Sequence, residues 1–360
     1  MVSSQSKTID ESMPVLIGVA AVNQRFEAAG DGKQAWQLMV DALEAAAADA
    51  GNSDLLAQAD EIQVPKGTWA YTNPSKILAD EVGANRAETV LVEIGILQQS
   101  MFSRACNQIA DGESSIILIA GGESKYRDLR AMIAGIELND VREQDIAPDL
   151  VLSPLSELRS QVERNAGLGM PVGDYAMIDS ALRYHQGLSL DEHRDQIAEL
   201  YEGFSRIAGL NPDAWNRQPV DASFIRGPSA KNKMLAYPYT KWHNSQWNVD
   251  QASALIFCSV GKARELGIDE EKWVFPLAST ESNFISMVAT RKELHRSPGF
   301  YHSGKQALAL SGKTIEEIDF MELYSCFPSA VRVQLQELGL DFSTNLSVTG
   351  AMTFAGGPLN

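Results

Sequence analysis

The chain has 360 residues, of which 44% are hydrophobic and 21% charged, and this globular composition is long enough for two hydrophobic cores. A formal net charge of −17 repels phosphate backbones, which argues against a general nucleic-acid binder. No apolar run has the length of a membrane span, and the polar start is unlike a secretory signal, so we expect a cytoplasmic protein. The cysteines are too few and too irregularly spaced for a disulfide framework or a structural zinc site: Cys106, Cys258 and Cys326.

Apolar strands and helices alternate through the first third of the chain. Strands are predicted at 14–22, 60–67, 89–94 and 114–123. Helices are predicted at 35–51, 73–83 and 98–110. Asn73 followed by Pro74 is the pattern of a helix N-cap and a first-turn proline. The alternation indicates a mostly parallel sheet covered by helices.

Residues 125–233 differ, because they carry charged helical segments and proline-containing turns but no continuous apolar strand. We interpret them as an inserted, mainly helical lid. A strand at 248–260 and a helix at 261–268 follow, and then a second α/β set, with strands at 272–280, 318–327 and 345–360 and helices at 299–312 and 328–340. The predicted domains are a first half, a lid and a second half: 13–124 with 234–268, then 125–233, then 269–360.

Four segments resemble the thiolase superfamily and occur in the same order as in that family. They are "IADGESSIILIAGGES", "NVDQASALIF" with "GKARELGI", "MELYSCFPSAV" and "TGAMTFAGGP". The third is most similar to the sterol-carrier type of thiolase-like protein. The resemblance implies a five-layer αβαβα fold with two similar mixed sheets and a helical lid. It also implies an enzyme of the acyltransferase family in lipid metabolism, similar to acetyl-CoA acetyltransferase, with acyl-CoA as substrate.

The resemblance also shows what this chain lacks. A thiolase holds its acyl group on a Cys before a buried helix, activates that Cys with the His of a Gly-His-Pro motif, and moves the α-proton with a second Cys. Counted back from Gly112, the nucleophile's position is Gly95, which has no side chain. The Gly-His-Pro motif corresponds to Gly356, Gly357 and Pro358, so the His is replaced by Gly357, and the second Cys would lie beyond the last residue. Classical thiolysis is therefore doubtful.

The segment "YSCF", which we call the YSCF segment, corresponds to a family motif that holds catalytic groups. It comprises Tyr324, Ser325, Cys326 and Phe327, and it leads into a helix that begins with Pro328. The positive end of that helix favours an anionic group, so Tyr324 could act as an acid or base if its pKa of ~10 were lowered. The alternative is a segment that only packs and caps. Cys106, by contrast, is more simply interpreted as a small buried helix residue than as a relocated nucleophile.

Other candidate residues are substrate-binding. Gly95, Gly356 and Gly357 would lie near the acyl group by resemblance, as would His243, for which the alternative is a packed side chain. Lys231 and Lys233, close to Arg226, could meet the phosphates of coenzyme A, or could simply be a solvated basic face. The histidines share no ligand spacing, so we expect no metal, and coenzyme A is expected only as part of the substrate.

Three functions remain open. The first is acyl-CoA carbon–carbon bond chemistry of the acyltransferase type, which the missing nucleophile opposes. The second is retro-aldol cleavage of a β-hydroxyacyl-CoA, which needs no acyl-enzyme, with Tyr324 as base and Gly95 making room for the substrate. The third is a non-catalytic subunit that binds acyl-CoA. The resemblance implies a homodimer formed through the strand near Gly95, and it raises the possibility of a small OB-fold partner protein.

Overall fold

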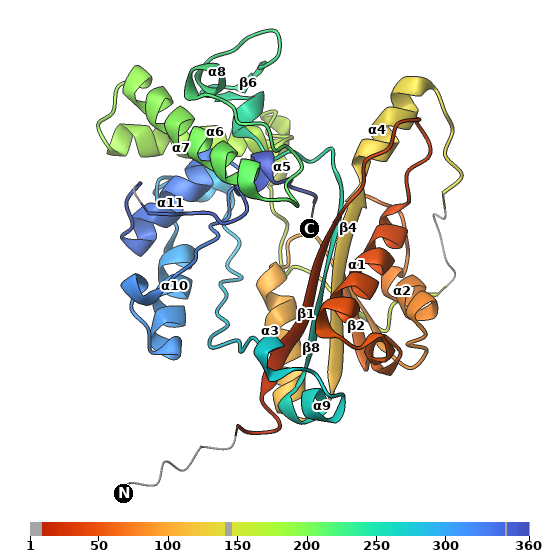
Figure 1. The fold of residues 1–360 in the computed structure, drawn as a ribbon. Coiled ribbons are helices and arrows are strands. Elements are labelled where there is room, and N and C mark those ends of the chain that lie inside the picture. Colours follow the sequence, from red (N-terminus) through yellow and green to blue (C-terminus); the bar gives the residue numbers. More distant parts are fainter. Residues whose placement is uncertain (1–8, 141–145, 343, 360) are drawn as a thin grey trace, which may run out of the picture. The chain divides into compact units, whose positions relative to one another are not determined.

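Figure 1 shows the computed structural model, which describes residues 9–140, 146–342 and 344–359. The chain divides into two compact units. Unit 1 comprises Met1–Pro154, Asp250–Ser279 and Leu359–Asn360, and unit 2 comprises Leu155–Val249 and Thr280–Pro358. None of the described helices is both long enough and apolar enough to cross a membrane.

Unit 1 is built on a six-stranded mixed sheet with the strand order β1-β8-β4-β2-β3-β5. The strands are β1 (Pro14–Asn23), β2 (Glu61–Pro65), β3 (Glu88–Val92), β4 (Ile116–Ser124), β5 (Leu150–Leu152) and β8 (Asp250–Ser259). β2 pairs in parallel with β3 and β4, β3 pairs in parallel with β5, and β8 runs antiparallel between β1 and β4. The predicted mostly parallel sheet is therefore confirmed, and β8 is its antiparallel member.

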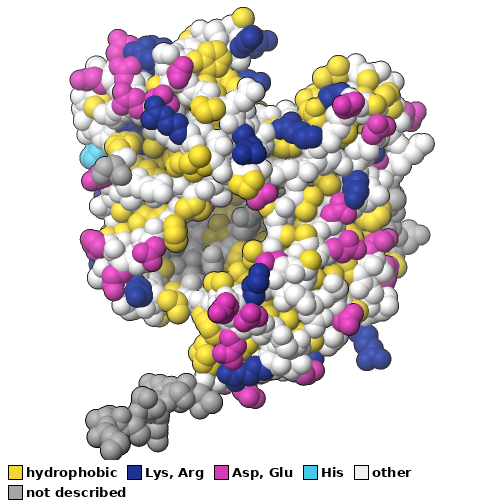
Figure 2. Space-filling model, in the orientation of Figure 1, with side chains coloured by type: hydrophobic (Ala, Val, Ile, Leu, Met, Phe, Trp, Pro, Cys, Tyr) yellow, Lys and Arg dark blue, Asp and Glu magenta, His cyan; other side chains and the backbone are white. Residues whose placement is uncertain are grey.

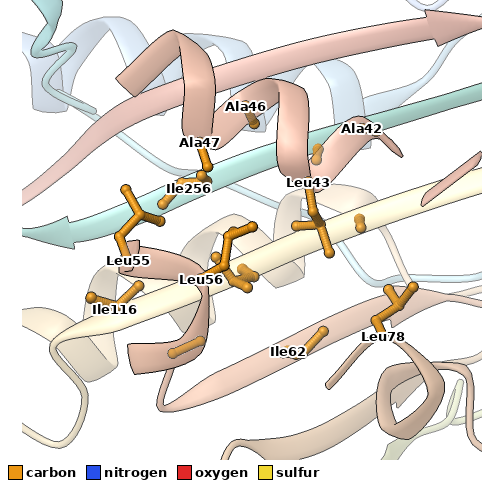
Figure 3. Close-up of a cluster of buried hydrophobic side chains, with 14 of the residues drawn as sticks. Ala42, Leu43, Ala46, Ala47, Leu55, Leu56, Ile62, Leu78, Ile116 and Ile256 are labelled. Atoms are coloured by element: carbon orange, nitrogen blue, oxygen red, sulfur yellow. The ribbon is translucent and has the colours of Figure 1, made fainter. Parts of the chain in front are cut away.

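Helices cover both faces of this sheet (Figure 1). They are α1 (Ala35–Ala50), α2 (Pro74–Val82), α3 (Gln98–Ala110), α4 (Lys125–Ala134) and α9 (Val260–Glu265). On one face, Leu43 of α1 packs with Ile62, Ile116 and Ile256 of the strands (Figure 3). On the other face, α3 buries Met101, Ala105 and Ile109 against β3, β4 and β8. Successive strand residues point to opposite faces, so each apolar strand contributes to both layers.

The helix predictions in unit 1 hold where the signals are local. α3 has the predicted bounds 98–110. Asn73 is the N-cap of α2, where its side chain accepts a hydrogen bond from the Lys76 amide, and Pro74 is the first helical residue. These contacts join residues within four positions of each other, so the sequence pattern alone is enough to predict them.

Strand β5 is a correction, because it lies within the residues that the sequence assigns to a helical lid. It pairs with β3 from Val90 opposite Leu150 to Val92 opposite Leu152. The Asp149 carboxylate adds to this pairing by accepting from the amide and the hydroxyl of Thr89 at 2.9 and 2.7 Å. With three residues, β5 is too short for its alternation to be recognised in the sequence. It covers the free edge of β3.

Unit 2 is mainly helical and carries a two-stranded sheet, β6 (Met234–Ala236) with β7 (Tyr239–Thr240). Its helices are α5 (Gln161–Asn165), α6 (Pro171–His185), α7 (Leu190–Leu210), α8 (Ala222–Arg226), α10 (Pro298–Ser311), α11 (Pro328–Leu338) and α12 (Ala351–Phe354). Its largest apolar cluster joins α7, α11 and α12 through Tyr201, Phe204, Val331, Leu335 and Phe354. Short 3₁₀ helices of the two units lie at Ser53–Gln58, Lys241–His243, Glu270–Lys272, Val288–Thr290 and Ile315–Glu317.

The three strands predicted for the second half are wrong in the described part of the chain. At 272–280 there is one isolated bridge, in which Val274 and Leu16 exchange hydrogen bonds of 2.9 and 3.0 Å. At 318–327 the Leu323 amide donates to the Leu346 carbonyl at 3.0 Å, without a continuing ladder. Residues 345–359 contain the helix α12 instead of a strand. Apolar side chains such as Leu323 and Leu346 are buried there, but a strand also needs a paired neighbour, which these segments lack.

Candidate functional site

Gly95 lies in the turn between β3 and α3 of unit 1, and α3 is buried on one face only. Its φ of 109° is a conformation that residues with a side chain rarely adopt. The turn is held by the Glu93 amide, which donates to the Leu152 carbonyl at 2.8 Å, and by the Ile96 amide, which donates to the Glu93 carbonyl at 3.1 Å. Gly95 thus lies in the predicted turn between a strand and a helix. The backbone conformation at position 95 therefore favours glycine.

Two thiols that could have replaced a nucleophile are not activated. Cys106, on α3, packs against the cluster of Met101 and Phe257, and burial raises the pKa of its thiol. Cys258, on β8, is fully buried, and burial raises its pKa to about 12. A nucleophilic cysteine needs a lowered pKa, so both thiols behave as packing residues.

The YSCF segment of unit 2 leads into α11, with Phe327 as N-cap and Pro328 as the first helical residue. Tyr324 is 51% exposed, whereas Cys326 is 5% exposed and Phe327 is buried. The Ser245 amide and hydroxyl both donate to the Cys326 carbonyl at 3.1 Å, which fixes the backbone. The segment therefore presents one phenol outward and holds one thiol inside.

The charge state of this segment differs from the expected one. Desolvation, followed by the neighbouring Cys326 thiol, raises the pKa of Tyr324 above its ordinary value of 10. Burial raises the pKa of Cys326 to about 11. The loss of hydration on burial disfavours the charged form of both groups. Near neutral pH, Tyr324 is thus a neutral phenol that can donate a hydrogen bond, whereas a base would need its pKa lowered.

Ser325 acts as a cap for the next element. Its hydroxyl accepts from the Met352 amide at 3.1 Å, while the Ser347 hydroxyl accepts from the amides of Gly350 and Ala351 at 2.9 and 3.0 Å. The two serines satisfy amides at the start of α12. Ser325 therefore links the YSCF segment to the glycine-rich segment that contains Gly356 and Gly357.

Gly357 lies where the resemblance expects a histidine, and there is little room for one. A Cβ atom on Gly357 would lie 3.0 Å from the Ser245 Cβ, 3.1 Å from the Met352 Cβ and 3.2 Å from the Met352 carbonyl oxygen. The Gly357 amide donates to the Gln246 carbonyl at 3.0 Å, and Gly356 has a φ of 112°. Any side chain at Gly357 would have to displace these neighbours, so the surroundings match glycine.

His243 is fully buried and neutral. Its Nδ1 accepts from the Thr240 amide at 3.1 Å and lies 3.0 Å from the Thr240 hydroxyl. Its ring lies near Tyr201 and Tyr239, with centroids 5.5 and 6.1 Å apart. Burial lowers the pKa of His243 to about 4. This geometry favours a packed side chain over a residue that contacts substrate.

Lys231 and Lys233 are exposed on the loop between α8 and β6. Between them, Asn232 is fully buried, and its amide nitrogen donates to the carbonyls of Phe224, Ile225 and Gly227 at 2.8, 3.1 and 3.1 Å. Asn232 thereby anchors the loop with a lysine on each side. Figure 2 shows several Lys and Arg side chains over the part of unit 2 that carries α8 and β6.

Arg226, the third member of the predicted basic group, is engaged elsewhere. Its guanidinium donates to Asp191 at 2.9 Å and also pairs with Asp195. Arg226 is therefore removed from the predicted basic group, which leaves Lys231 and Lys233 as its candidate members. Among the described residues, no group of three or more His, Cys, Asp and Glu side chains could hold a metal ion.

Tyr175, on α6, is the residue at this site that sequence reasoning missed. Its ring stacks on that of Phe327, with centroids 4.5 Å apart, and it packs against the buried cluster that contains Cys326. No motif marks it, because α6 is about 150 residues away from the YSCF segment in sequence. The apolar periodicity of α6 was the only available signal, and it does not select one tyrosine.

No family model matches the sequence, and no curated protein matches it either. Solved structures do match. A monomeric SCP2-thiolase like protein type 1 (STLP1) from Mycobacterium smegmatis is 25% identical, with a TM-score of 0.78 over 97% of this chain and 69% of that chain. The Ltp2-ChsH2(DUF35) aldolase is 18% identical, with a TM-score of 0.68 over 96% and 86%. The acetyl-CoA acetyltransferase from Syntrophomonas wolfei is 19% identical, with a TM-score of 0.62 over 96% and 89%.

The α/β fold with its six-stranded mixed sheet is thus thiolase-like, as predicted. The chain belongs to the thiolase superfamily. Within that superfamily it is similar to an SCP2-thiolase like protein, in agreement with the sterol-carrier type that the YSCF segment resembles.

Proposed function

We propose that the protein binds an acyl-CoA and acts on a carbon–carbon bond next to the thioester without storing the acyl group on the enzyme. The observation that carries this proposal is Gly95, which has no side chain and a φ of 109° at the nucleophile's position. The surroundings of Gly357 support it, because they leave little room for an activating histidine. Thiolysis and Claisen condensation through an acyl-enzyme are therefore disfavoured, whereas chemistry through a thioester enolate is not.

The reaction that fits these residues best is retro-aldol cleavage of a β-hydroxyacyl-CoA. The β-hydroxyl gives its proton to a solvent water, the Cα–Cβ bond breaks, and the electron pair of that bond moves into the thioester to form an enolate. An aldehyde or ketone leaves, and the enolate carbon then takes up a proton. The similarity to the Ltp2-ChsH2(DUF35) aldolase supports this choice.

Tyr324 is proposed as the hydrogen-bond donor to the enolate oxygen. It is a neutral, half-exposed phenol, and the Gln334 side chain of α11 holds its backbone amide and carbonyl at 3.2 and 2.8 Å. Its raised pKa does not suit the role of base that the sequence suggested, but a neutral O–H donor stabilises the negative charge that develops on the thioester oxygen. Cys326 is neutral as well, because burial raises the pKa of its thiol to about 11.

For the coenzyme A part of the substrate, we propose Lys231 and Lys233. Their loop is anchored through Asn232, so two cations are presented from a defined backbone. The protein has a net charge of −17, and a local basic pair is what an anionic ligand needs against that field.

Two assemblies are proposed. A homodimer is one, and the dimeric peroxisomal thiolase of Saccharomyces cerevisiae, which has the same fold, motivates it. Because β5 already pairs with β3, such a dimer would need a surface other than the β3 edge. Assembly with a small partner protein of OB-fold type is the other, supported by the similarity to the Ltp2-ChsH2(DUF35) complex. Light scattering and co-purification would test the two.

Binding of acyl-CoA without turnover is a second candidate function, favoured by the absence of both the nucleophile and the Gly-His-Pro histidine. Three assays on the full chain separate the possibilities. We expect aldehyde or ketone release from a β-hydroxyacyl-CoA, and no thiolysis of acetoacetyl-CoA. Calorimetric binding of acyl-CoA with no release from any β-hydroxyacyl-CoA would favour the non-catalytic subunit, and thiolysis at ordinary rates would contradict the proposal.

A further inference from the structure

The Gln334 side chain of α11 holds the backbone of Tyr324 through two hydrogen bonds. Its amide nitrogen donates to the Tyr324 carbonyl at 2.8 Å, and its amide oxygen accepts from the Tyr324 amide at 3.2 Å. In an antiparallel ladder, two paired residues exchange the same two hydrogen bonds. The Gln334 side chain therefore replaces a neighbouring strand at Tyr324, in a segment that the structure describes without a strand.

The orientation of the Gln334 amide group follows from its surroundings. Its nitrogen lies between two carbonyl oxygens, because it also donates to the Ala330 carbonyl, one turn earlier in α11, at 2.9 Å. A flipped amide would place its oxygen against both carbonyls and its nitrogen against the Tyr324 N–H, and would lose all three hydrogen bonds. Gln334 is 5% exposed, so little water competes for these contacts. The amide group therefore has one favourable orientation.

The backbone on either side of Tyr324 is also fixed within unit 2. The Leu323 amide donates to the Leu346 carbonyl at 3.0 Å, and the Cys326 carbonyl accepts from the Ser245 amide at 3.1 Å. The Tyr324 side chain, by contrast, is 51% exposed, so packing limits its position less than it limits that of a buried ring. The direction of its Cα–Cβ bond, which the backbone sets, then decides what the phenol reaches in each rotamer.

We propose that Gln334 is a positioning residue, which fixes the Tyr324 backbone and so aims the phenol at the thioester oxygen of the substrate. This inference rests on the proposed function, because it takes Tyr324 as the hydrogen-bond donor to the enolate oxygen. Catalysis is sensitive to such alignment, and a displacement of about 1 Å can lower a rate about 100-fold. Gln334 acts through Tyr324 and does not touch the substrate.

A matched pair of variants separates this role from a general contribution to folding. Gln334→Met keeps an unbranched side chain of similar length and removes both hydrogen bonds with Tyr324. Gln336→Met is the control, because Gln336 lies on the same helix and donates to the His295 carbonyl at 3.2 Å. If Gln334→Met does not fold, Gln334→Asn replaces it, since it keeps a polar amide but is one methylene too short to make both contacts.

The first test places a fluorinated tyrosine at position 324 and records ¹⁹F NMR spectra of the full chain without ligand. Gln334→Met should shift or broaden the signal from position 324, because the backbone there loses its two hydrogen bonds. Gln336→Met should leave the signal unchanged. An unchanged signal in Gln334→Met would overturn the inference, whether or not the protein cleaves a substrate.

The second test measures kcat and KM for release from a β-hydroxyacyl-CoA. Gln334→Met should lower kcat about 10-fold to 100-fold. KM should change little, because the proposed contacts of Lys231 and Lys233 with coenzyme A stay in place. In a Tyr324→Phe background, which lacks the hydroxyl to be aimed, Gln334→Met should lower kcat no further.

Equal falls in kcat in the two backgrounds would show that Gln334 supports the fold as a whole, and would overturn the inference. A fall in kcat matched by Gln336→Met would overturn it as well. A changed signal at position 324 in a protein that cleaves no β-hydroxyacyl-CoA would support the contact between Gln334 and Tyr324 and contradict the proposed function.

Discussion

The Arg332 guanidinium of α11 donates to the Nδ1 of His193 on α7, with 2.7 Å between the two nitrogens. Because Nδ1 accepts, His193 carries its proton on Nε2, which lies 2.7 Å from a carboxylate oxygen of Asp179 on α6. Arg332 also donates to the other oxygen of Asp179 at 3.3 Å. All three side chains are buried. The ion pair between Arg332 and Asp179 and the neutral ring of His193 thus join α11 to α6 and α7.

Removing one partner of this buried cluster should destabilise the protein strongly. In Asp179→Ala, the charge of Arg332 stays buried without its counterion, and we expect a loss of about 3–5 kcal/mol in the free energy of unfolding. Urea denaturation measures it. The control is Glu202→Ala, which removes an exposed pair with Arg206 and should cost no more than about 1 kcal/mol. Equal effects of the two substitutions would contradict the assigned burial.

His243 should make stability depend on pH in the acid range. Burial lowers its pKa in the folded protein to about 4, from about 6.5 in the unfolded chain. Between these values the unfolded state binds more protons, so the stabilisation is complete above pH 6.5 and is lost as the pH falls toward 4. Its full size is roughly 3 kcal/mol.

This pH effect is measured as a difference, because carboxylates titrate in the same range. Urea denaturation at several pH values between about 4 and 7 is compared for the wild type and for His243→Gln. The wild type should lose more stability than the variant as the pH decreases. Parallel curves would show that His243 protonates equally well in both states.

Restoring a thiol at position 95 should not restore a thiolase. Gly95→Cys puts a side chain at a φ of 109°, and we expect this strain to cost roughly 1–2 kcal/mol. The variant also lacks the activating histidine, so incubation with acetyl-CoA should give no acetylated protein by mass spectrometry. Gly95→Ala, which carries the same strain without a thiol, is the control for folding. A stoichiometric acetyl adduct on the introduced thiol would disprove the prediction.

Loss of the Tyr324 hydroxyl should affect catalysis and spare binding. A donor aimed at a developing oxyanion contributes in the transition state, so Tyr324→Phe should lower kcat for release from a β-hydroxyacyl-CoA about 100-fold to 1,000-fold. KM should change little. Tyr237→Phe, at an exposed position of the same unit, is the control. Unchanged kcat in Tyr324→Phe would remove Tyr324 from the mechanism.

The positive charges of Lys231 and Lys233 should strengthen the binding of coenzyme A, and this contribution should decrease as the salt concentration increases. The double variant Lys231→Ala, Lys233→Ala should bind acyl-CoA about tenfold more weakly at low ionic strength, with a smaller difference at high ionic strength because exposed charges are screened. Calorimetry measures both. Lys313→Ala, which removes an exposed lysine beside Glu317, serves as control. If the control variant reduced the affinity for acyl-CoA equally, the lysines would act through the overall charge of the protein and not through a local binding site.

Sequence alone determined the features whose causes lie close together in the chain. The bounds of α3, the Asn73 cap with Pro74, and the Pro328 start of α11 all follow from contacts within one helical turn. The motif order identified the superfamily, and the position of Gly95 before a helix was found by counting residues. Neither required knowledge of which distant segments meet.

The tertiary structure decided what depends on distant partners. Strand patterns at 272–280 and 318–327 form no ladder, because a strand requires a neighbour that its own sequence does not specify. Tyr175 reaches the YSCF segment only because α6 packs on α11, and the direction of the Tyr324 pKa shift depends on how far that packing removes water. The hydration of a side chain and the pairing of a strand depend on residues that the fold brings together from distant parts of the chain. Helix caps and helical periodicity depend on residues that are neighbours in the sequence.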